Sequence, residues 1–121
     1  MSTRLETARL IIRTFEQSDA EAWIAMVSDP AVRRYLPPSP LPTMETFQAA
    51  IARRHALERE RGYAMWAVDA NDTGAFAGQC GVQPVEGTPD VELAYHFTRA
   101  SWGKGYATEA ASAVLTHFSP T

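Results

Sequence analysis

The segment SWGKGYATEA, residues 101–110, carries the clearest chemical signal in the sequence. Two glycines, Gly103 and Gly105, frame Lys104, which is the only lysine of the chain. Glycine lets a ligand approach the main chain closely, and the free N–H groups at the start of a following helix favour an anion. The segment therefore predicts a phosphate or pyrophosphate site, with a plain tight turn between a strand and a helix as the alternative interpretation.

This glycine-rich segment does not match the common nucleotide-binding loops. The pattern GxxxxGK[ST] of P-loop proteins does not occur in the sequence, and the dinucleotide pattern GxGxxG is incomplete. No parallel unit of strand, helix and strand is expected around the segment. Kinase and dehydrogenase functions are therefore excluded.

A carboxylate and an imidazole occur two strand steps apart in residues 91–97. In this segment apolar side chains alternate with Glu92, Ala94 and His96, which is the period of a β-strand. Glu92 and His96 then lie on one face, where either side chain can relay a proton. The alternative for Glu92 is an exposed strand carboxylate, and for His96 it is packing or lining a cofactor channel.

Other reactive side chains predict no site of their own. Cys80 has no base nearby and is expected to be a buried thiol. The three histidines are too far apart to predict a metal site, and Glu109 is expected to complement a helix dipole. The aromatic residues Trp23, Tyr35 and Trp66 could line an acceptor pocket, but aromatic residues at strand or helix spacing are more often core residues, so they are assigned to the core.

Composition limits the class of protein. The chain has 121 residues, 45% of them hydrophobic and 21% charged, with a formal net charge of −3, which predicts one soluble domain over residues 1–121. This charge argues against nucleic acid as the main ligand and mildly favours amine-bearing partners. A single cysteine and the lack of a signal-peptide pattern predict a cytoplasmic protein. No apolar stretch approaches the ~20 residues that cross a bilayer.

The elements that position these residues begin with a strand and a helix. Residues 9–15 alternate apolar side chains as a strand does. Ser18 and Glu21 have the spacing of a capping box, which predicts that a helix opens there. Asp29 and Pro30 are expected to end this helix.

The middle of the chain predicts a stiff loop followed by a second helix. Four of the eight prolines fall within residues 37–42, which favours an extended surface loop. The next helix is expected to start after Thr43, as its N-cap, and to end at Gly62.

The rest of the chain predicts three strands and a third helix. Gly78 and Gly81 are interpreted as marks of a β-bulge. Apolar side chains recur at helical spacing from Ala107 onward, which predicts the third helix. The strands are expected at residues 63–69, 76–82 and 91–97.

Three motifs and this element order resemble the GNAT superfamily of acetyl-CoA-dependent N-acetyltransferases, and more closely its RimJ/RimL-like branch. The motifs are LETARLIIRTF (residues 5–15), VELAYHF (91–97) and WGKGYATEA (102–110). The resemblance covers nearly the whole chain. It implies an α+β fold with a mixed, mostly antiparallel sheet in the order strand, helix, helix, strand, strand, strand, helix, and with the helices packed on the sheet.

The resemblance also implies a cofactor site. In this family the pattern [QR]xxGx[GA] cradles the pyrophosphate of CoA, and here Gly105 and Ala107 take its small positions and Trp102 its first. Tryptophan at that position is usual in the RimJ/RimL-like branch. The implied cosubstrate is acetyl-CoA, with no metal, and the implied binding residues are Phe97, Thr98, Trp102, Gly103, Lys104, Gly105, Tyr106, Ala107 and Thr108.

The implied reaction is direct attack of a primary amine on acetyl-CoA in a ternary complex. The amine belongs to a protein N-terminus or a small molecule, and no nucleic acid or membrane takes part. Glu92 is the preferred proton acceptor, usually through water in the family. A main-chain N–H within residues 93–95 would stabilise the charge on the carbonyl oxygen.

A complete member of the family continues after the third helix with a strand, a helix and a pair of strands, about 45 residues by average element lengths. The resemblance therefore implies that this C-terminal portion is absent and that residues 91–97 form an open strand edge. We expect a truncated or frame-shifted acetyltransferase, or a chain that obtains a strand from a neighbour as a homodimer or by strand exchange. The alternative is a non-catalytic GNAT-like module that associates with a partner or with itself through this edge.

Overall fold

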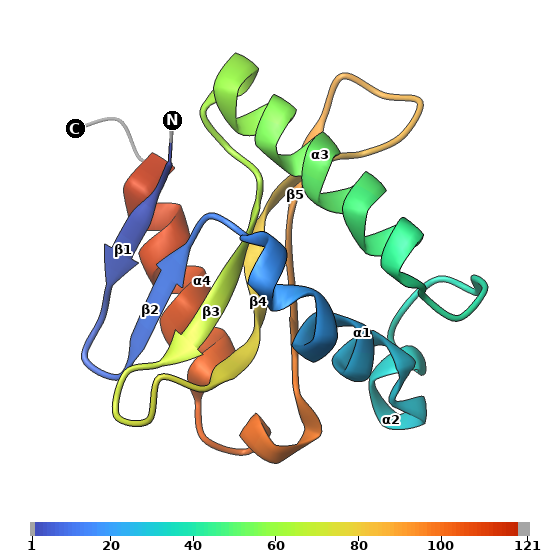
Figure 1. The fold of residues 1–121 in the computed structure, drawn as a ribbon. Helices are drawn as coiled ribbons and strands as arrows, with labels where there is room; N and C mark the ends of the chain where they lie inside the picture. Colours follow the sequence, from blue (N-terminus) through green and yellow to red (C-terminus); the bar gives the residue numbers. More distant parts are fainter. Residues whose placement is uncertain (1, 119–121) are drawn as a thin grey trace.

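Five antiparallel strands form the central sheet of the computed structural model, which describes residues 2–118. Their order in the sheet follows their order in the chain, and each strand pairs antiparallel with the next. Within the described residues, β5 forms one edge of the sheet and β1 the other, as Figure 1 shows. The strands are β1 (Arg4–Glu6), β2 (Leu10–Arg13), β3 (Met65–Ala70), β4 (Phe76–Pro84) and β5 (Val91–Phe97).

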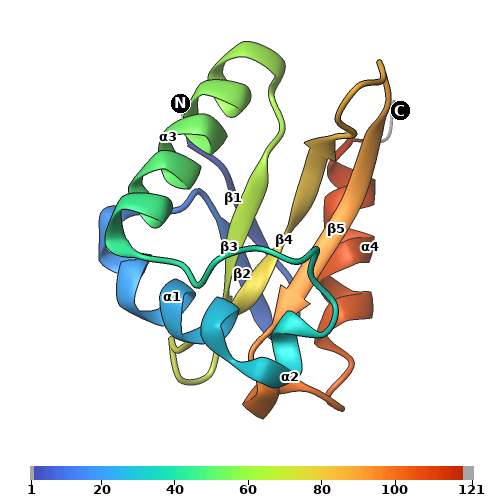
Figure 2. The same ribbon diagram turned by 90° about the vertical axis from the view of Figure 1, so that its right-hand side faces the viewer.

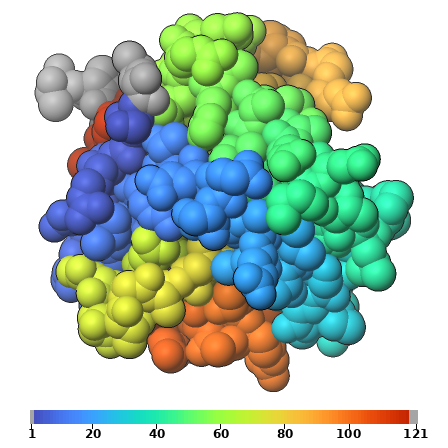
Figure 3. Space-filling view, in the orientation of Figure 1, coloured from blue at the N-terminus to red at the C-terminus, as the bar shows by residue number. Residues whose placement is uncertain are grey.

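Helices cover both faces of this sheet. They are α1 (Ala20–Ser28), α2 (Pro30–Arg33), α3 (Met44–Arg61) and α4 (Tyr106–Phe118), with 3-10 turns η1 (Gln17–Asp19) and η2 (Arg99–Ser101). α1 and α3 lie on one face of the sheet and α4 on the other (Figure 2). The space-filling view shows the α1 and α3 side densely covered, with the segment around residue 100, in orange, at the lower surface (Figure 3). This α+β arrangement confirms the predicted fold class.

Apolar side chains fill both interfaces between the sheet and the helices. On the α4 side, Trp66 is fully buried and belongs to one cluster with Ala110 and Val114. On the other side, Trp23 and Phe47 belong to a second cluster, and their ring centroids lie 5.6 Å apart. Removing apolar surface from water contributes a stabilising free energy of about 25 cal/mol per Å². The two clusters therefore hold the helices on the sheet.

Several boundaries agree with the sequence patterns. The hydroxyl oxygen of Thr43 accepts the N–H of Thr46 at 3.2 Å, and Gly62 ends α3 in the left-handed conformation with φ of 79°. β5 spans the predicted residues 91–97, and α4 begins at Tyr106, one residue before the predicted start. Capping chemistry and clear periodicity therefore located these elements well.

The N-terminal motif forms two strands, whereas the sequence predicts one. β1 precedes β2, and a tight turn connects them. In this turn the N–H of Thr7 donates to the carbonyl of Leu10 at 2.9 Å, and the N–H of Leu10 donates to the Thr7 hydroxyl at 3.0 Å. These two hydrogen bonds close the turn, so that β1 can fold back and pair with β2. A single strand over residues 9–15 would have no such turn.

The predicted capping box at Ser18 and Glu21 is wrong. Ser18 lies inside η1, and α1 begins at Ala20. The carboxylate of Asp19 instead accepts the N–H of Glu16 at 2.8 Å, and it also forms an ion pair with Arg13. The capping box therefore lies two residues before the predicted one, with Glu16 at the N-cap and Asp19 at the third position.

Asp29 and Pro30 end α1 as predicted, but they also start a further helix. The Asp29 carboxylate accepts the N–H of Ala31 at 2.9 Å, and Pro30 is the first residue of α2. Proline is favoured at that position because its fixed φ suits a helix and its missing N–H is not needed there. The sequence pattern predicts only the end of a helix at these two residues.

Gly78 and Gly81 of β4 occur in different structural surroundings. A register shift occurs between Val68 and Asp69 of β3, opposite the segment of β4 that contains Gly78, so a bulge does lie beside that glycine. Gly81 is in regular register with Met65. A Cβ on Gly81 would lie 2.0 Å from the carbonyl oxygen of Ala64, so close approach of β3 requires glycine there. The bulge prediction is wrong for Gly81.

Candidate cofactor and acetyl-transfer site

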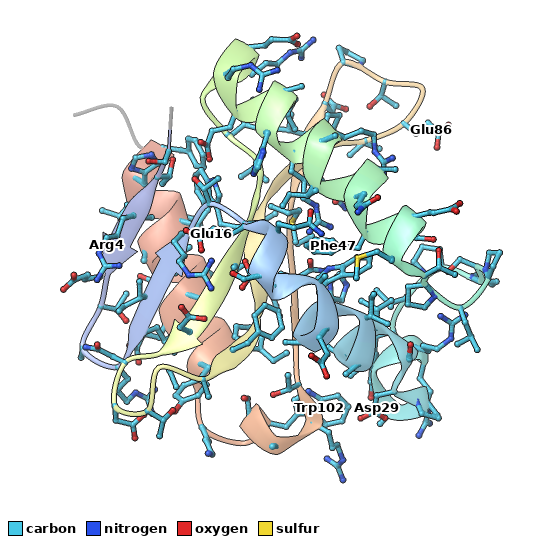
Figure 4. All side chains as sticks on the ribbon, in the orientation of Figure 1. Arg4, Glu16, Asp29, Phe47, Glu86 and Trp102 are labelled. Carbon is cyan, nitrogen blue, oxygen red and sulfur yellow. The ribbon has the colours of Figure 1, made fainter. Side chains whose placement is uncertain are left out.

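The loop that leaves β5 is held at its start by Trp102. The indole N–H of Trp102 donates to the carbonyl of Phe97 at 2.9 Å, and the guanidinium of Arg99 lies 4.7 Å from the indole centroid. The hydroxyl oxygens of Thr98 and Ser101 are 2.7 Å apart. Figure 4 labels Trp102 at the lower edge of the molecule, beneath the helical layer. These contacts set the path of the chain into the glycine segment.

Main-chain N–H groups gather where this loop becomes α4. Gly103 and Gly105 both adopt positive φ, 78° and 79°, a conformation that other residues rarely adopt. Within residues 2–118, the N–H groups of residues 103–108 donate no hydrogen bond. The first N–H groups of an α-helix have no partner inside the helix and carry the positive end of its dipole. This arrangement presents donors to an anion.

A cavity of about 420 Å³ opens beside this loop. Seven predicted binding residues line it, namely Phe97, Trp102, Gly103, Gly105, Tyr106, Ala107 and Thr108. The walls also contain His96 of β5, for which lining a cofactor channel is one of the predicted alternatives. Four further lining residues are not among the predicted binding residues, namely Val32 and Tyr35 from the α2 region, Tyr95 from β5, and Ser101. The structure thus brings most of the predicted segment to one cavity.

Three predicted site residues lie outside the lining of this cavity. Thr98 is engaged with Ser101, as described above. The side chain of Lys104 is exposed, and its ammonium nitrogen lies 5.9 Å from the ring centroid of Tyr106. Glu92 is also exposed, and its carboxylate accepts a hydrogen bond from the Gln83 amide at 3.0 Å.

A side-chain brace joins the turn between β1 and β2 to the glycine loop. The guanidinium of Arg9 donates to the carbonyl of Lys104 and to the carboxylate of Glu109, each at 2.7 Å. The same carboxylate accepts the Arg9 N–H at 2.9 Å and the Thr7 hydroxyl. The bonds from Thr7 and Arg9 hold the pKa of Glu109 below its ordinary value. Glu109 therefore does more than complement the helix dipole.

His96 lies on the same face of β5 as Glu92, as predicted, and it belongs to a buried polar network. Its Nδ1 lies 3.0 Å from the side-chain nitrogen of Gln79. The side-chain oxygen of Gln79 accepts the indole N–H of Trp23 at 3.0 Å and a guanidinium N–H of Arg54 at 2.9 Å. Burial, followed by the positive charge of Arg54, lowers the pKa of His96.

Of the other residues assigned to the core from the sequence, all but Tyr35 are buried. Trp23, Trp66 and Cys80 are buried, and burial raises the pKa of the Cys80 thiol to about 12. Tyr35 is 71% exposed, so its assignment to the core is wrong, and its ring centroid lies 6.0 Å from that of Trp102. Among residues 2–118 no group of three or more metal-ligating side chains occurs, and no helix is long and apolar enough to cross a membrane.

The glycine loop and its cavity occur in a chain whose sequence matches a known domain. A model of the acetyltransferase (GNAT) domain matches residues 9–121. The chain belongs to this family. The GNAT family uses acetyl-CoA, and the unpartnered donors, the two glycines at positive φ and the adjoining cavity fit a pyrophosphate-bearing cosubstrate.

Individual proteins are similar to this GNAT chain over most of its length. The uncharacterized protein YkkB of Bacillus subtilis is 33% identical to this GNAT chain over 118 residues, covering 95% of the chain and 67% of YkkB. The crystal structure of an acetyltransferase from Agrobacterium tumefaciens matches with a TM-score of 0.79 and 26% identity, covering 94% of this chain and 65% of that one. The GNAT chain thus spans about two thirds of the length of these relatives.

A third comparison bears on the predicted branch. A structure of RimL, a ribosomal L7/L12 α-N-protein acetyltransferase in complex with coenzyme A, matches this GNAT chain with a TM-score of 0.78. The two sequences are 18% identical, and the match covers 96% of this chain and 67% of RimL. At that identity the likeness establishes the shared fold.

Proposed function

We propose that this GNAT chain binds acetyl-CoA and transfers its acetyl group to a primary amine. The observation that carries the proposal is the set of N–H groups of residues 103–108, which have no partner within residues 2–118 and adjoin a cavity of about 420 Å³. Membership of the GNAT family supports the same activity.

The loop is the proposed pyrophosphate site. The two phosphates of CoA carry negative charge, which the N–H groups of residues 103–108 and the positive end of the α4 dipole stabilise. Gly103 and Gly105 let these N–H groups approach the phosphate oxygens without a side chain between them. Trp102 and Phe97 hold the loop in this position, and exposed Lys104 adds positive charge at its surface.

The acetyl transfer forms a bond between the amine nitrogen and the carbonyl carbon and breaks the bond from that carbon to sulfur. The amine loses one proton, and the departing thiolate gains one. Glu92 is the proposed proton acceptor; because its exposed carboxylate lies outside the cavity lining, the proton passes through water. β5 is an edge strand within residues 2–118, so alternate N–H groups of residues 93–95 are available to the carbonyl oxygen as it gains charge.

A protein N-terminus is the favoured acceptor in this proposal, with small amines as the second class. The fold shared with RimL and the tryptophan at position 102 support the RimJ/RimL-like branch. The net charge of −3 is compatible with a cationic amine acceptor.

Calorimetric titration with CoA tests the cofactor site. The variant Gly105→Ala places a Cβ at a φ of 79° and 3.3 Å from the Arg9 guanidinium, so we expect CoA binding to weaken markedly. Gly87→Ala is the matched control, because Gly87 has the same φ of 79° with open space around it and lies in the turn between β4 and β5. Equal CoA affinity in the two variants would contradict the proposed pyrophosphate site.

An assay of thiol release with mixed peptide and small amines tests the transfer. Glu92→Gln removes the proposed proton acceptor, and we expect kcat to fall on the order of 100-fold at neutral pH. Glu86→Gln, in the exposed turn before β5 (Figure 4), is the control and should retain full turnover. Full turnover by Glu92→Gln would remove this residue from the mechanism.

A second candidate function rests on the edge strand. Val91 and Tyr95 of β5 are 49% and 47% exposed, and within residues 2–118 no strand pairs with the outer side of β5. Such an edge can pair with another chain. A non-catalytic module that associates through β5 would show self-association or partner binding with neither CoA binding nor thiol release.

A further inference from the structure

The side-chain amide of Gln79 connects three elements next to the cavity. Gln79 belongs to β4 and is only 4% exposed. Its oxygen accepts hydrogen bonds from Trp23 of α1 and Arg54 of α3, at 3.0 and 2.9 Å. Its nitrogen lies 3.0 Å from Nδ1 of His96, which belongs to β5 and lines the cavity.

These contacts fix the orientation of the Gln79 amide. The Trp23 indole and the Arg54 guanidinium can only donate hydrogen bonds, so the atom of Gln79 that faces them must be its oxygen. The NH₂ group of Gln79 therefore faces His96. An NH₂ group only donates, so Nδ1 of His96 must be the acceptor and carries no proton.

The protonation state of His96 follows from this orientation. A neutral imidazole with an unprotonated Nδ1 carries its proton on Nε2. A doubly protonated ring would place an N–H against the NH₂ group of Gln79 and a second positive charge near Arg54. Arg54 itself has no ion-pair partner within residues 2–118, so no carboxylate offsets its charge there. The ring is therefore held neutral.

The Nε2–H of His96 has no hydrogen-bond partner within residues 2–118. Its neighbours in the strand, Tyr95 and Phe97, line the same cavity, as does Val32, and they give it mainly apolar walls. A lone donor in such a wall is satisfied by a ligand that brings an acceptor. Acetyl-CoA carries such acceptors near its reactive end, in the thioester carbonyl and the amide carbonyls of its pantetheine arm.

We propose that His96 donates its Nε2–H to a carbonyl oxygen of bound acetyl-CoA and that Gln79 is the positioning residue that keeps the proton on that nitrogen. This inference rests on the proposed function. It assigns His96 a donor role and excludes it as the general base, because its only lone pair in the ring plane accepts the bond from Gln79. The amine proton must then go to another group, which leaves that role to Glu92.

Nitrogen-15 NMR of the histidine side chains tests the tautomer directly. In the unmodified protein we expect a protonated Nε2 and an unprotonated Nδ1 for His96, identified by comparison with His96→Gln. Acetyl-CoA should shift the Nε2–H proton resonance downfield as the new hydrogen bond forms. A protonated Nδ1 in the unmodified protein would overturn the inference. An unchanged His96 resonance under conditions where calorimetry detects acetyl-CoA binding would also overturn it.

The variant Gln79→Glu exchanges one NH₂ group for an oxygen and leaves the size of the side chain unchanged. The carboxylate still accepts from Trp23 and Arg54, but it can face His96 only as an acceptor. We expect the proton of neutral His96 to move to Nδ1, so that Nε2 loses its donor role as the pH rises. The downfield shift on acetyl-CoA binding should then disappear at alkaline pH. Gln48→Glu, on the exposed side of α3, adds the same charge elsewhere and should keep the shift.

Binding and turnover give a second measurement. His96→Leu removes the donor, and we expect kcat/KM for acetyl-CoA to fall on the order of tenfold, the effect of one hydrogen bond. His96→Gln keeps an amide N–H near the position of Nε2 and should recover part of the loss. An unchanged kcat/KM in His96→Leu would overturn this inference and leave the acetyltransferase function intact. Failure of the unmodified protein to bind acetyl-CoA would overturn both.

Discussion

The guanidinium Nε of Arg9 lies 2.7 Å from the carboxylate of Glu109, although the two residues are 100 positions apart in the sequence. Arg9 belongs to the turn between β1 and β2, and Glu109 to the first turn of α4. Because Arg9 also donates to the carbonyl of Lys104, the first hairpin of the chain holds the glycine loop from outside. The geometry of the proposed pyrophosphate site thus depends on residues at both ends of the sequence.

Arg9→Met should weaken CoA binding. The substitution removes the bonds from the guanidinium to Lys104 and Glu109, so the glycine loop is less ordered before CoA binds. Part of the binding free energy is then spent on ordering this loop. We expect CoA affinity to fall by about threefold to tenfold, which corresponds to one hydrogen bond of about 1 kcal/mol. Arg4→Met is the control for calorimetry, because within residues 2–118 Arg4 forms its ion pair with Glu6, at 3.0 Å, and both side chains are exposed. Equal losses in the two variants would contradict a specific brace.

Gly81→Ala should lower the stability of the fold. The added Cβ would lie 2.0 Å from the carbonyl oxygen of Ala64, so β3 and β4 must separate locally. We expect the free energy of unfolding in urea to fall by about 1–3 kcal/mol, the usual effect of overpacking. Gln48→Ala on the exposed side of α3 should change it by less than about 0.5 kcal/mol. Unchanged stability of Gly81→Ala would show that the strands accommodate a methyl group there.

Stability should depend on the protonation of His96. Burial and Arg54 lower its pKa in the folded protein, so below the ordinary histidine value of 6.5 the unfolded chain binds a proton that the folded protein does not. The stabilising contribution of neutral His96 is complete above that value and decreases as the pH falls toward the folded pKa. We expect His96→Gln to lose less stability than the unmodified protein over this range, measured by urea unfolding at several pH values. Parallel pH profiles would indicate that His96 has an ordinary pKa.

Tyr35→Ala should affect binding more than folding. The side chain is 71% exposed and lines the cavity beside Trp102, so it contributes little to the core. We expect acetyl-CoA affinity to fall severalfold, since an aromatic contact contributes about 1 kcal/mol, while the melting temperature changes little. Leu41→Ala, at a position 63% exposed and outside the cavity lining, is the matched control. A large drop in melting temperature with unchanged affinity would reverse this assignment.

Local patterns in the sequence predicted most of the elements. Alternation located β5, helical spacing located α4, and Thr43 with Gly62 bounded α3. Residues that are compatible with two structural roles gave less accurate predictions. Asp29 and Pro30 end one helix and begin another, because an acceptor followed by proline suits a helix start as well as a stop.

The parts of the site that could not be predicted depend on contacts between segments that are distant in the sequence. The glycine loop was recognised from residues 101–110 themselves, and most of its predicted residues line one cavity. The Arg9 brace and the contribution of Tyr35 have no local sequence signal, because they depend on how the first hairpin and α2 pack against the loop. For His96 the strand period predicted the face, whereas its tautomer depends on Trp23 and Arg54 of the helical layer.

The burial of Cys80 has a practical use. This residue is the only cysteine of the chain, is 0% exposed and has a thiol pKa raised to about 12, so thiol-modifying reagents cannot reach a reactive thiolate in the folded state. Alkylation therefore requires the sheet to separate from α4. The rate at which a maleimide labels Cys80 therefore reports how often the interior opens. This rate can be compared between the variants discussed above without an added probe.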